Sequence, residues 1–175
     1  SFIKRIFSMR MRMDYAAPTD PKEEVSKPVT FEQWTQWVLS SELRLAVREA
    51  AAALSEGKPT ARPLLRVLRK EAGTVRGEPS SRRITMLQAP RVFTLGLASD
   101  SARASKTEVG ECCQGIEEHL NLRDVFDLSE DLQYSLVSIS SFYESHWLCF
   151  CKRGGAGWLL YDDDRAIVVG PTFAD

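Results

Sequence analysis

The sequence predicts an α+β fold in which helices come first and a mostly antiparallel sheet follows. Apolar side chains recur at helical spacing between residues 30 and 72. The stretch Gln133–Tyr143 is instead rich in β-branched and aromatic residues, which is typical of a strand. Further along, the paired glycines Gly154-Gly155 separate two β-rich runs and indicate the turn of a hairpin.

The N-terminal part, residues 1–86, is expected to combine one strand with a helical segment. Ser8–Met13 alternates polar and apolar residues, as a half-buried strand does. The basic start of the chain, residues 1–13, is also compatible with a transit peptide, and we favour the strand. Thr30–Gln33 has the Thr-x-x-Gln pattern of a capping box, so a helix is predicted to begin there.

Two helices are therefore expected in this part. The first carries Trp34 and Trp37 at helical spacing, which predicts that both indole rings lie in the core, and it ends at Gly57. The second spans Pro63–Ala72. The leucines expected on its buried side are Leu64, Leu65 and Leu68.

The C-terminal part, residues 87–175, is expected to form strands around one helix. Residues 73–83, which precede this part, show no periodicity and are predicted to be an exposed loop. Within the C-terminal part, the polar stretch 99–106 is predicted to be a loop as well. The predicted elements are a strand at Arg91–Ala98, a helix at Val109–Leu120, a long strand at Gln133–Tyr143, the two hairpin strands, and a last strand at Ala166–Val169.

Charge and cysteine spacing exclude several classes of function. The 23 Lys and Arg residues balance 24 Asp and Glu residues, and this gives no field that favours nucleic acid or an anionic membrane as a partner. No apolar run reaches the roughly 18 residues that span a bilayer. The pairs Cys112-Cys113 and Cys149-x-Cys151 lack the spacing of a zinc ribbon, so neither a metal nor a cofactor is expected. Reduced thiols are typical of cytoplasmic or nuclear proteins.

The chain has two histidines, and only one stands in a pattern that suggests chemistry. His119 falls on the polar side of the predicted helix, where a solvated side chain is expected. His146 opens the first hairpin strand. A five-residue loop would place it opposite Asp162, whereas a two-residue turn at Gly154-Gly155 would place it opposite Asp163.

A carboxylate beside an imidazole fixes its tautomer and stabilises its protonated form, as in hydrolase triads. A slip of one residue turns every side chain to the other face, so only one of the two aspartates is expected to orient His146. The spacing does not choose between them. It is also compatible with a surface histidine beside an acidic turn.

Five segments, taken together and in order, resemble ubiquitin-specific proteases, most closely the divergent and partly inactive branch of that family. Each segment matches one family pattern, and the set covers residues 87–173. The segments are Leu87–Leu97 (aP-x-VftigL), Leu122–Phe126 (L-x-d-l-F), Tyr134–Trp147 (the histidine box), Trp158–Asp163 (W-x-x-f-D-D) and Val168–Gly170 (V-x-x-v-G).

The resemblance implies a papain-like cysteine-protease palm, a twisted antiparallel sheet with N-terminal helices. By the same resemblance His146 is the general base and Asp162 its orienting acid, with Asp163 as the alternative. Trp147 and Ser145 would contact the substrate. The implied partner is ubiquitin or a ubiquitinated protein, whose C-terminal tail is cleaved by a thiolate; other protein subunits are possible partners as well.

The departures from the family pattern concern the nucleophile. The chain has no Gly-Asn-Thr-Cys box, and Asn121 is its single asparagine. Cys112-Cys113 opens a predicted helix, whose N-terminus could stabilise a thiolate, but its setting differs from that of the family nucleophile. We therefore predict the C-terminal His/Asp part of such a domain, inactive on its own. The alternatives are a non-catalytic binding scaffold and a structural subunit of a larger assembly.

Overall fold

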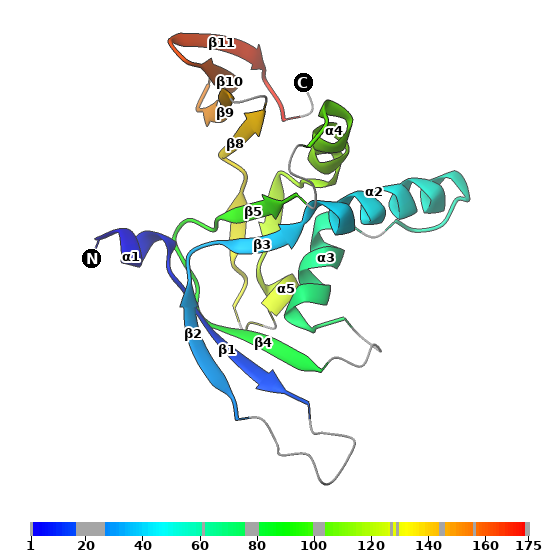
Figure 1. Ribbon diagram of the computed structural model, residues 1–175, viewed down its shortest axis with the longest axis vertical. Helices are drawn as coiled ribbons and strands as arrows, with labels where there is room; N and C mark the ends of the chain where they lie inside the picture. Colours follow the sequence, from blue (N-terminus) through cyan, green and yellow to red (C-terminus); the bar gives the residue numbers. More distant parts are fainter. Residues whose placement is uncertain are drawn as a thin grey trace.

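The structure is a computed structural model that describes residues 2–16, 27–60, 62–75, 81–99, 104–126, 128, 130–143, 146–155 and 157–173. The molecule is elongated: a three-stranded sheet lies at one end, a four-stranded sheet at the other, and most helices lie along one side between them (Figure 1). The mixture of helix and sheet agrees with the prediction. The predicted order, helices before strands, is wrong, because three strands precede the first long helix. No helix in the described ranges is long and apolar enough to cross a membrane.

The elements follow one another along the chain as labelled in Figure 1. The helices are α1 (Phe2–Phe7), α2 (Ser40–Ser55), α3 (Pro63–Ala72), α4 (Lys106–Gly115) and α5 (Arg123–Phe126). The strands are β1 (Met9–Tyr15), β2 (Val29–Gln33), β3 (Gln36–Leu39), β4 (Arg82–Gln88), β5 (Leu95–Ala98), β6 (His119–Asn121), β7 (Gln133–Ser135), β8 (Ser138–Tyr143), β9 (His146–Arg153), β10 (Gly157–Asp162) and β11 (Arg165–Gly170).

The three-stranded sheet has β1 at its centre, between β2 and β4, and both pairings are antiparallel. Met9 and Met11 are fully buried, whereas Arg10 and Arg12 between and after them are exposed. This alternation confirms the predicted N-terminal strand, because successive side chains of a strand point to opposite faces. The preceding helix α1 and strand β4 were not predicted.

The helix predicted to begin at Thr30 is wrong in its first ten residues. Thr30 pairs with Arg12 in the ladder between β1 and β2, and α2 begins only at Ser40. The backbone groups that a capping box would satisfy are used by strand pairing, so tertiary contact overrides the local pattern. Trp34 and Trp37 are 53% and 61% exposed, so the prediction that they lie in the core is also wrong.

Helix α3 agrees with its prediction at both ends. Pro63 occupies the first turn, where a missing N–H costs nothing. Gly73 ends the helix in the left-handed conformation with φ of 68°. Leu64, Leu65 and Leu68 are buried in the core cluster, as expected.

The predicted helix at Val109–Leu120 is shifted toward the N-terminus in the structure. Ser105 caps α4 by accepting a hydrogen bond from the Glu108 amide, and the Glu108 carboxylate accepts one from the Ser105 amide in return. His119 therefore lies on strand β6 and not on a helix, which corrects the prediction for this residue. The expected long strand divides into β7, which pairs with β6, and β8, which pairs with β9.

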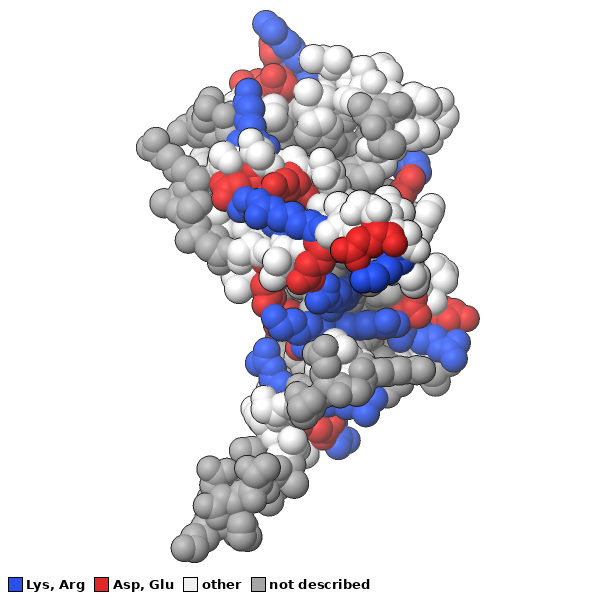
Figure 2. Space-filling model, turned by 90° about the vertical axis from the view of Figure 1, so that its right-hand side faces the viewer, with Lys and Arg blue, Asp and Glu red and all other residues white. Residues whose placement is uncertain are grey.

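The surface formed by α2, α3 and α4 carries basic and acidic side chains next to one another (Figure 2). Arg44 of α2 contacts Glu108 and Glu111 of α4 at 2.6 and 2.5 Å, and Arg48 contacts Glu111 at 2.9 Å. These pairs join the two helices across their packing interface. On this face basic and acidic side chains neutralise one another, in keeping with the net charge of -1 for the whole chain.

Candidate functional site in the four-stranded sheet

The C-terminal sheet has the order β11-β10-β9-β8, with every neighbouring pair antiparallel. Strands β9 and β10 form the predicted hairpin, in which Gly157 pairs with Arg153. The connection is thus three residues long, so both predicted loop lengths are wrong. Asp162 pairs with Leu148 and not with His146.

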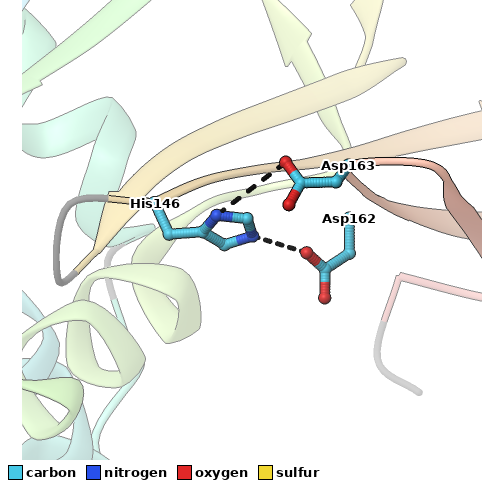
Figure 3. Close-up of side chains that lie close together, drawn as sticks. All are labelled: His146, Asp162 and Asp163. Carbon is cyan, nitrogen blue, oxygen red and sulfur yellow. Dashed lines mark hydrogen bonds and ion pairs between the residues drawn. The ribbon is translucent and has the colours of Figure 1, made fainter.

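His146 and Asp162 still share a face of the sheet. The observed register differs from the five-residue-loop register by two positions, and a shift of two keeps each side chain on its face. The two residues are diagonal neighbours across the ladder. The Nε2 atom of His146 lies 2.5 Å from Oδ1 of Asp162 (Figure 3).

Asp163 approaches the same imidazole from the other side. Its Oδ1 lies 4.0 Å from Nδ1 of His146, and its side chain is 79% exposed (Figure 3). Asp163 has φ of 51°, a left-handed conformation that ends β10 and turns the chain toward β11. Because of this turn the strict alternation of a strand stops at Asp162, and both aspartates reach the ring.

The electrostatics of the cluster favour a protonated imidazole. The hydrogen bond to Asp162 raises the pKa of His146; partial burial lowers this pKa, and the charge of Asp163 raises it further. In the neutral tautomer whose Nε2–H donates to Oδ1 of Asp162, Nδ1 is the nitrogen that can take up a proton.

The same three residues form a set of ligand atoms that could hold a cation. One atom each from His146, Asp162 and Asp163 lies within 4.8 Å of the others. Imidazole and carboxylate donors suit divalent metal ions. The sequence-based expectation that no metal is bound stays a prediction.

Trp147 points away from His146, because neighbouring residues of a strand face opposite sides. Its indole packs on the ring of Phe142, the residue opposite it on β8, with centroids 5.0 Å apart. A contact between Trp147 and a substrate would therefore be made on the reverse face. Phe142 was not singled out from the sequence, since only the register identifies it. Ser145, the other predicted substrate contact, lies outside the described residues.

None of the four cysteines is arranged as a nucleophile for His146. Cys149 and Cys151 lie on β9 at odd-numbered positions, like Trp147, and so face the other side of the sheet. Cys112 and Cys113 lie in the second half of α4, far from the helix N-terminus that the sequence suggested for them. Burial raises the pKa of both these thiols, whereas a nucleophilic thiolate needs a lowered pKa.

Comparisons with known proteins show similarity at the level of the fold. No family model matches the sequence, and no curated protein matches it. The chain is similar to a solved structure of the Ubp8-Sgf11-Sgf73-Sus1 SAGA DUB (deubiquitinase) module, with a TM-score of 0.62 and 15% sequence identity. That match covers 97% of this chain and 37% of the other.

Two further structures of the same kind match in the same way. A SAGA DUB module bound to monoubiquitin gives a TM-score of 0.58 at 15% identity, covering 96% of this chain and 38% of the other. The yeast SAGA DUB module with a substituted Sgf73 gives 0.59 at 14% identity, covering 96% and 35%. The chain thus spans less than two-fifths of its structural neighbours. Its fold is that of a ubiquitin-specific-protease-like domain, similar to Ubp8.

Proposed function

We propose that this chain is the C-terminal, His/Asp-bearing part of a ubiquitin-specific-protease-like domain and that it binds ubiquitin without hydrolysing it alone. The observation that carries the proposal is the hydrogen-bonded pair of His146 and Asp162 on neighbouring strands of a fold similar to Ubp8. The monoubiquitin bound by one of the structural neighbours supports ubiquitin as the partner.

In this proposal His146 moves protons for a thiol that none of the four cysteines supplies. Asp162 holds Nε2–H, and Nδ1 takes the proton of the thiol. The thiolate then attacks the carbonyl carbon of the terminal glycine of ubiquitin. His146 returns the proton to the leaving amine, and water cleaves the resulting acyl-enzyme. Without a thiol on the His146 face the first step fails, so the chain alone is inactive.

The test combines two measurements on the 175-residue chain. Isothermal titration with unmodified ubiquitin measures binding, and incubation with ubiquitin bearing a C-terminal vinyl electrophile measures thiol reactivity. We expect binding and no covalent adduct. Asp162→Asn tests the candidate site. Asp14→Asn, in the three-stranded sheet at the far end of the molecule, is the control for the loss of a carboxylate.

The outcomes separate the parts of the proposal. A covalent adduct would contradict inactivity, and peptide mapping would identify the reactive cysteine. Absence of ubiquitin binding would contradict the ubiquitin-binding function. Ubiquitin binding that Asp14→Asn weakens as much as Asp162→Asn on β10 does would place the contact away from the candidate site and would contradict its assignment.

A structural subunit of a larger assembly is the second candidate, and one observation favours it. Strand β11, at the edge of the sheet, exposes apolar side chains: Ile167 is 50% exposed and Val168 is 66% exposed. Exposed apolar side chains on an edge strand are typical of surfaces that another chain covers. Copurification of this chain with a fixed set of other proteins in constant proportion, lost on Val168→Asp, would support this alternative. The expected location, cytoplasmic or nuclear, stays a prediction.

A further inference from the structure

Cys149 and Cys151 form a pair of thiols that the proposed function does not use. They stand two positions apart on β9, so both point to the same face of the sheet, the reverse of the His146 face. Their sulfur atoms lie 3.4 Å apart, and both side chains are partly exposed. We propose that this dithiol is a binding site for a soft, thiophilic metal or metalloid ion, such as trivalent arsenic, Cd(II) or Cu(I).

The spacing of the sulfur atoms suits an ion that bridges them. An ion bound to each sulfur at about 2.3 Å with a tetrahedral angle places the sulfurs about 3.8 Å apart. The observed separation of 3.4 Å differs from this by a few tenths of an ångström. Rotation of the two side chains about their Cα–Cβ bonds is sufficient to make up the difference, without any movement of the backbone.

A disulfide between the same residues is less favourable. The sulfurs would have to approach to about 2.05 Å. Residues i and i+2 of an extended strand have Cα atoms about 6.6 Å apart, close to the upper limit of about 6.8 Å for a disulfide. Closing that bond would distort the strand that also carries His146. The geometry therefore favours chelation of an ion over oxidation.

The surroundings leave the pair accessible from one side. Ser140 and Ser138, the β8 residues opposite Cys149 and Cys151, are small and exposed. The Ser140 hydroxyl donates a hydrogen bond to Cys149 Sγ at 3.6 Å and provides an oxygen beside the site. The hydrogen bond with Cys149 raises the pKa of the Cys151 thiol. Thiolates select soft ions over Mg²⁺ or Ca²⁺.

The other two cysteines provide a built-in comparison. Cys112 and Cys113 are adjacent on α4, where neighbouring side chains diverge by about 100° around the helix axis. Cys112 is buried and its thiol donates to the carbonyl oxygen of Ser40 at 3.8 Å. Two thiols on different sides of a helix cannot close on one ion, so this pair is not expected to chelate.

Phenylarsine oxide is the probe. Its arsenic forms two As–S bonds with the two thiols, and its oxygen leaves as water with the two thiol protons. The oxidation state of arsenic does not change, and no further reactant is needed. One molecule of the arsenical therefore adds per dithiol.

The experiment is mass spectrometry of the intact, folded chain with one equivalent of phenylarsine oxide. We expect a single adduct that a dithiol such as 2,3-dimercaptopropanol removes and an equal amount of monothiol does not. Iodoacetamide applied after the arsenical should modify neither Cys149 nor Cys151. Each of Cys149→Ser and Cys151→Ser should abolish the adduct, and the double variant Cys112→Ser/Cys113→Ser should retain it.

Two results would overturn the inference. One is the absence of an adduct at one equivalent. The other is an adduct that persists in Cys149→Ser or disappears in the Cys112→Ser/Cys113→Ser control. Cys149→Ala provides a second test should the serine variant fail to fold, with circular dichroism as the check on folding. Ubiquitin binding is a separate measurement, so failure of the proposed function would leave this result unaffected.

Discussion

The two ends of the molecule are held together in different ways. The buried core cluster draws its members from the three-stranded sheet, the helices and the short strands between them, from Met9 to Phe126. The four-stranded sheet that carries the candidate site contributes Trp158 and Leu159 as its buried apolar residues among those described. One region rests on apolar packing, and the other rests mainly on ladder hydrogen bonds and turns.

This difference indicates which kinds of substitution should disturb the candidate site. In the packed region a side chain is held by many neighbours, so its volume determines stability. In the C-terminal sheet the position of His146 relative to Asp162 depends on the register of β9 and β10. Changes that act on a turn or on the ladder should matter there more than changes in apolar side chains.

The largest expected effect separates the two regions directly. Leu43→Ala removes a fully buried side chain of the core and should lower the free energy of unfolding by about 2–5 kcal/mol. Ile167→Ala in the C-terminal sheet, at a side chain 50% exposed, should change it by about 0.5 kcal/mol or less. Urea unfolding measures both. Leu45→Ala, on the same helix but 58% exposed, is the matched control. Equal losses in the free energy of unfolding for Leu43→Ala and Ile167→Ala would contradict this difference between the two regions.

A turn substitution should be the most damaging change in the C-terminal sheet. Gly157 has φ of 75°, and a Cβ there would collide with the carbonyl oxygen of Gly170 on β11. Gly157→Ala should therefore lower the free energy of unfolding by about 1–3 kcal/mol. Gly154→Ala in the same hairpin meets no atom within 4 Å and is the control. Thermal unfolding would contradict the prediction if both variants lost stability equally.

A helix cap should contribute a smaller amount in the packed region. Ser105→Ala removes the side chain that accepts a hydrogen bond from the Glu108 amide at the start of α4. We expect a loss of about 1 kcal/mol in the free energy of unfolding. Ser105→Asp retains a capping oxygen and should recover most of that loss. A value near zero for Ser105→Ala would indicate that packing against α2, and not the cap, holds this helix.

The smallest effect on stability is expected from the site itself, with a clear dependence on pH. The folded state raises the pKa of His146 above its ordinary value of about 6.5, mainly through Asp162. The raised pKa of His146 stabilises the folded state. This contribution is fully present below about pH 6.5 and is lost as the pH rises through the pKa of His146 in the folded state. Asp162→Asn should lower the pKa of His146, as measured by NMR titration of its ring protons.

Asp163→Asn is the matched control for that titration. Its carboxylate lies 4.0 Å from the ring and is 79% exposed, so the fall in the pKa of His146 should be smaller than with Asp162→Asn. The second set of histidine signals comes from His119, which lies outside this site on β6. Its Nδ1 contacts the Ser135 hydroxyl at 3.1 Å. A larger fall with Asp163→Asn would contradict the assignment of Asp162 as the partner.

The sequence by itself determined the features that depend on neighbouring residues. Helix α3 was predicted at both ends because the apolar spacing, Pro63 and Gly73 act within one helix. The strand β1 and the hairpin of β9 and β10 were predicted for the same reason. The spacing offered Asp162 or Asp163 as the partner of His146 without choosing between them. The observed register, two residues away from the first alternative, is what puts Asp162 on the His146 face.

The tertiary structure alone decided the features that need distant partners. Thr30–Gln33 has a good local pattern for a helix, yet pairing with β1 makes it a strand and leaves Trp34 exposed. The length of the hairpin loop, the approach of Asp163 and the pairing of Trp147 with Phe142 depend on register and turn conformation. Contacts between strands are made across space, and local propensity carries too little free energy to specify them.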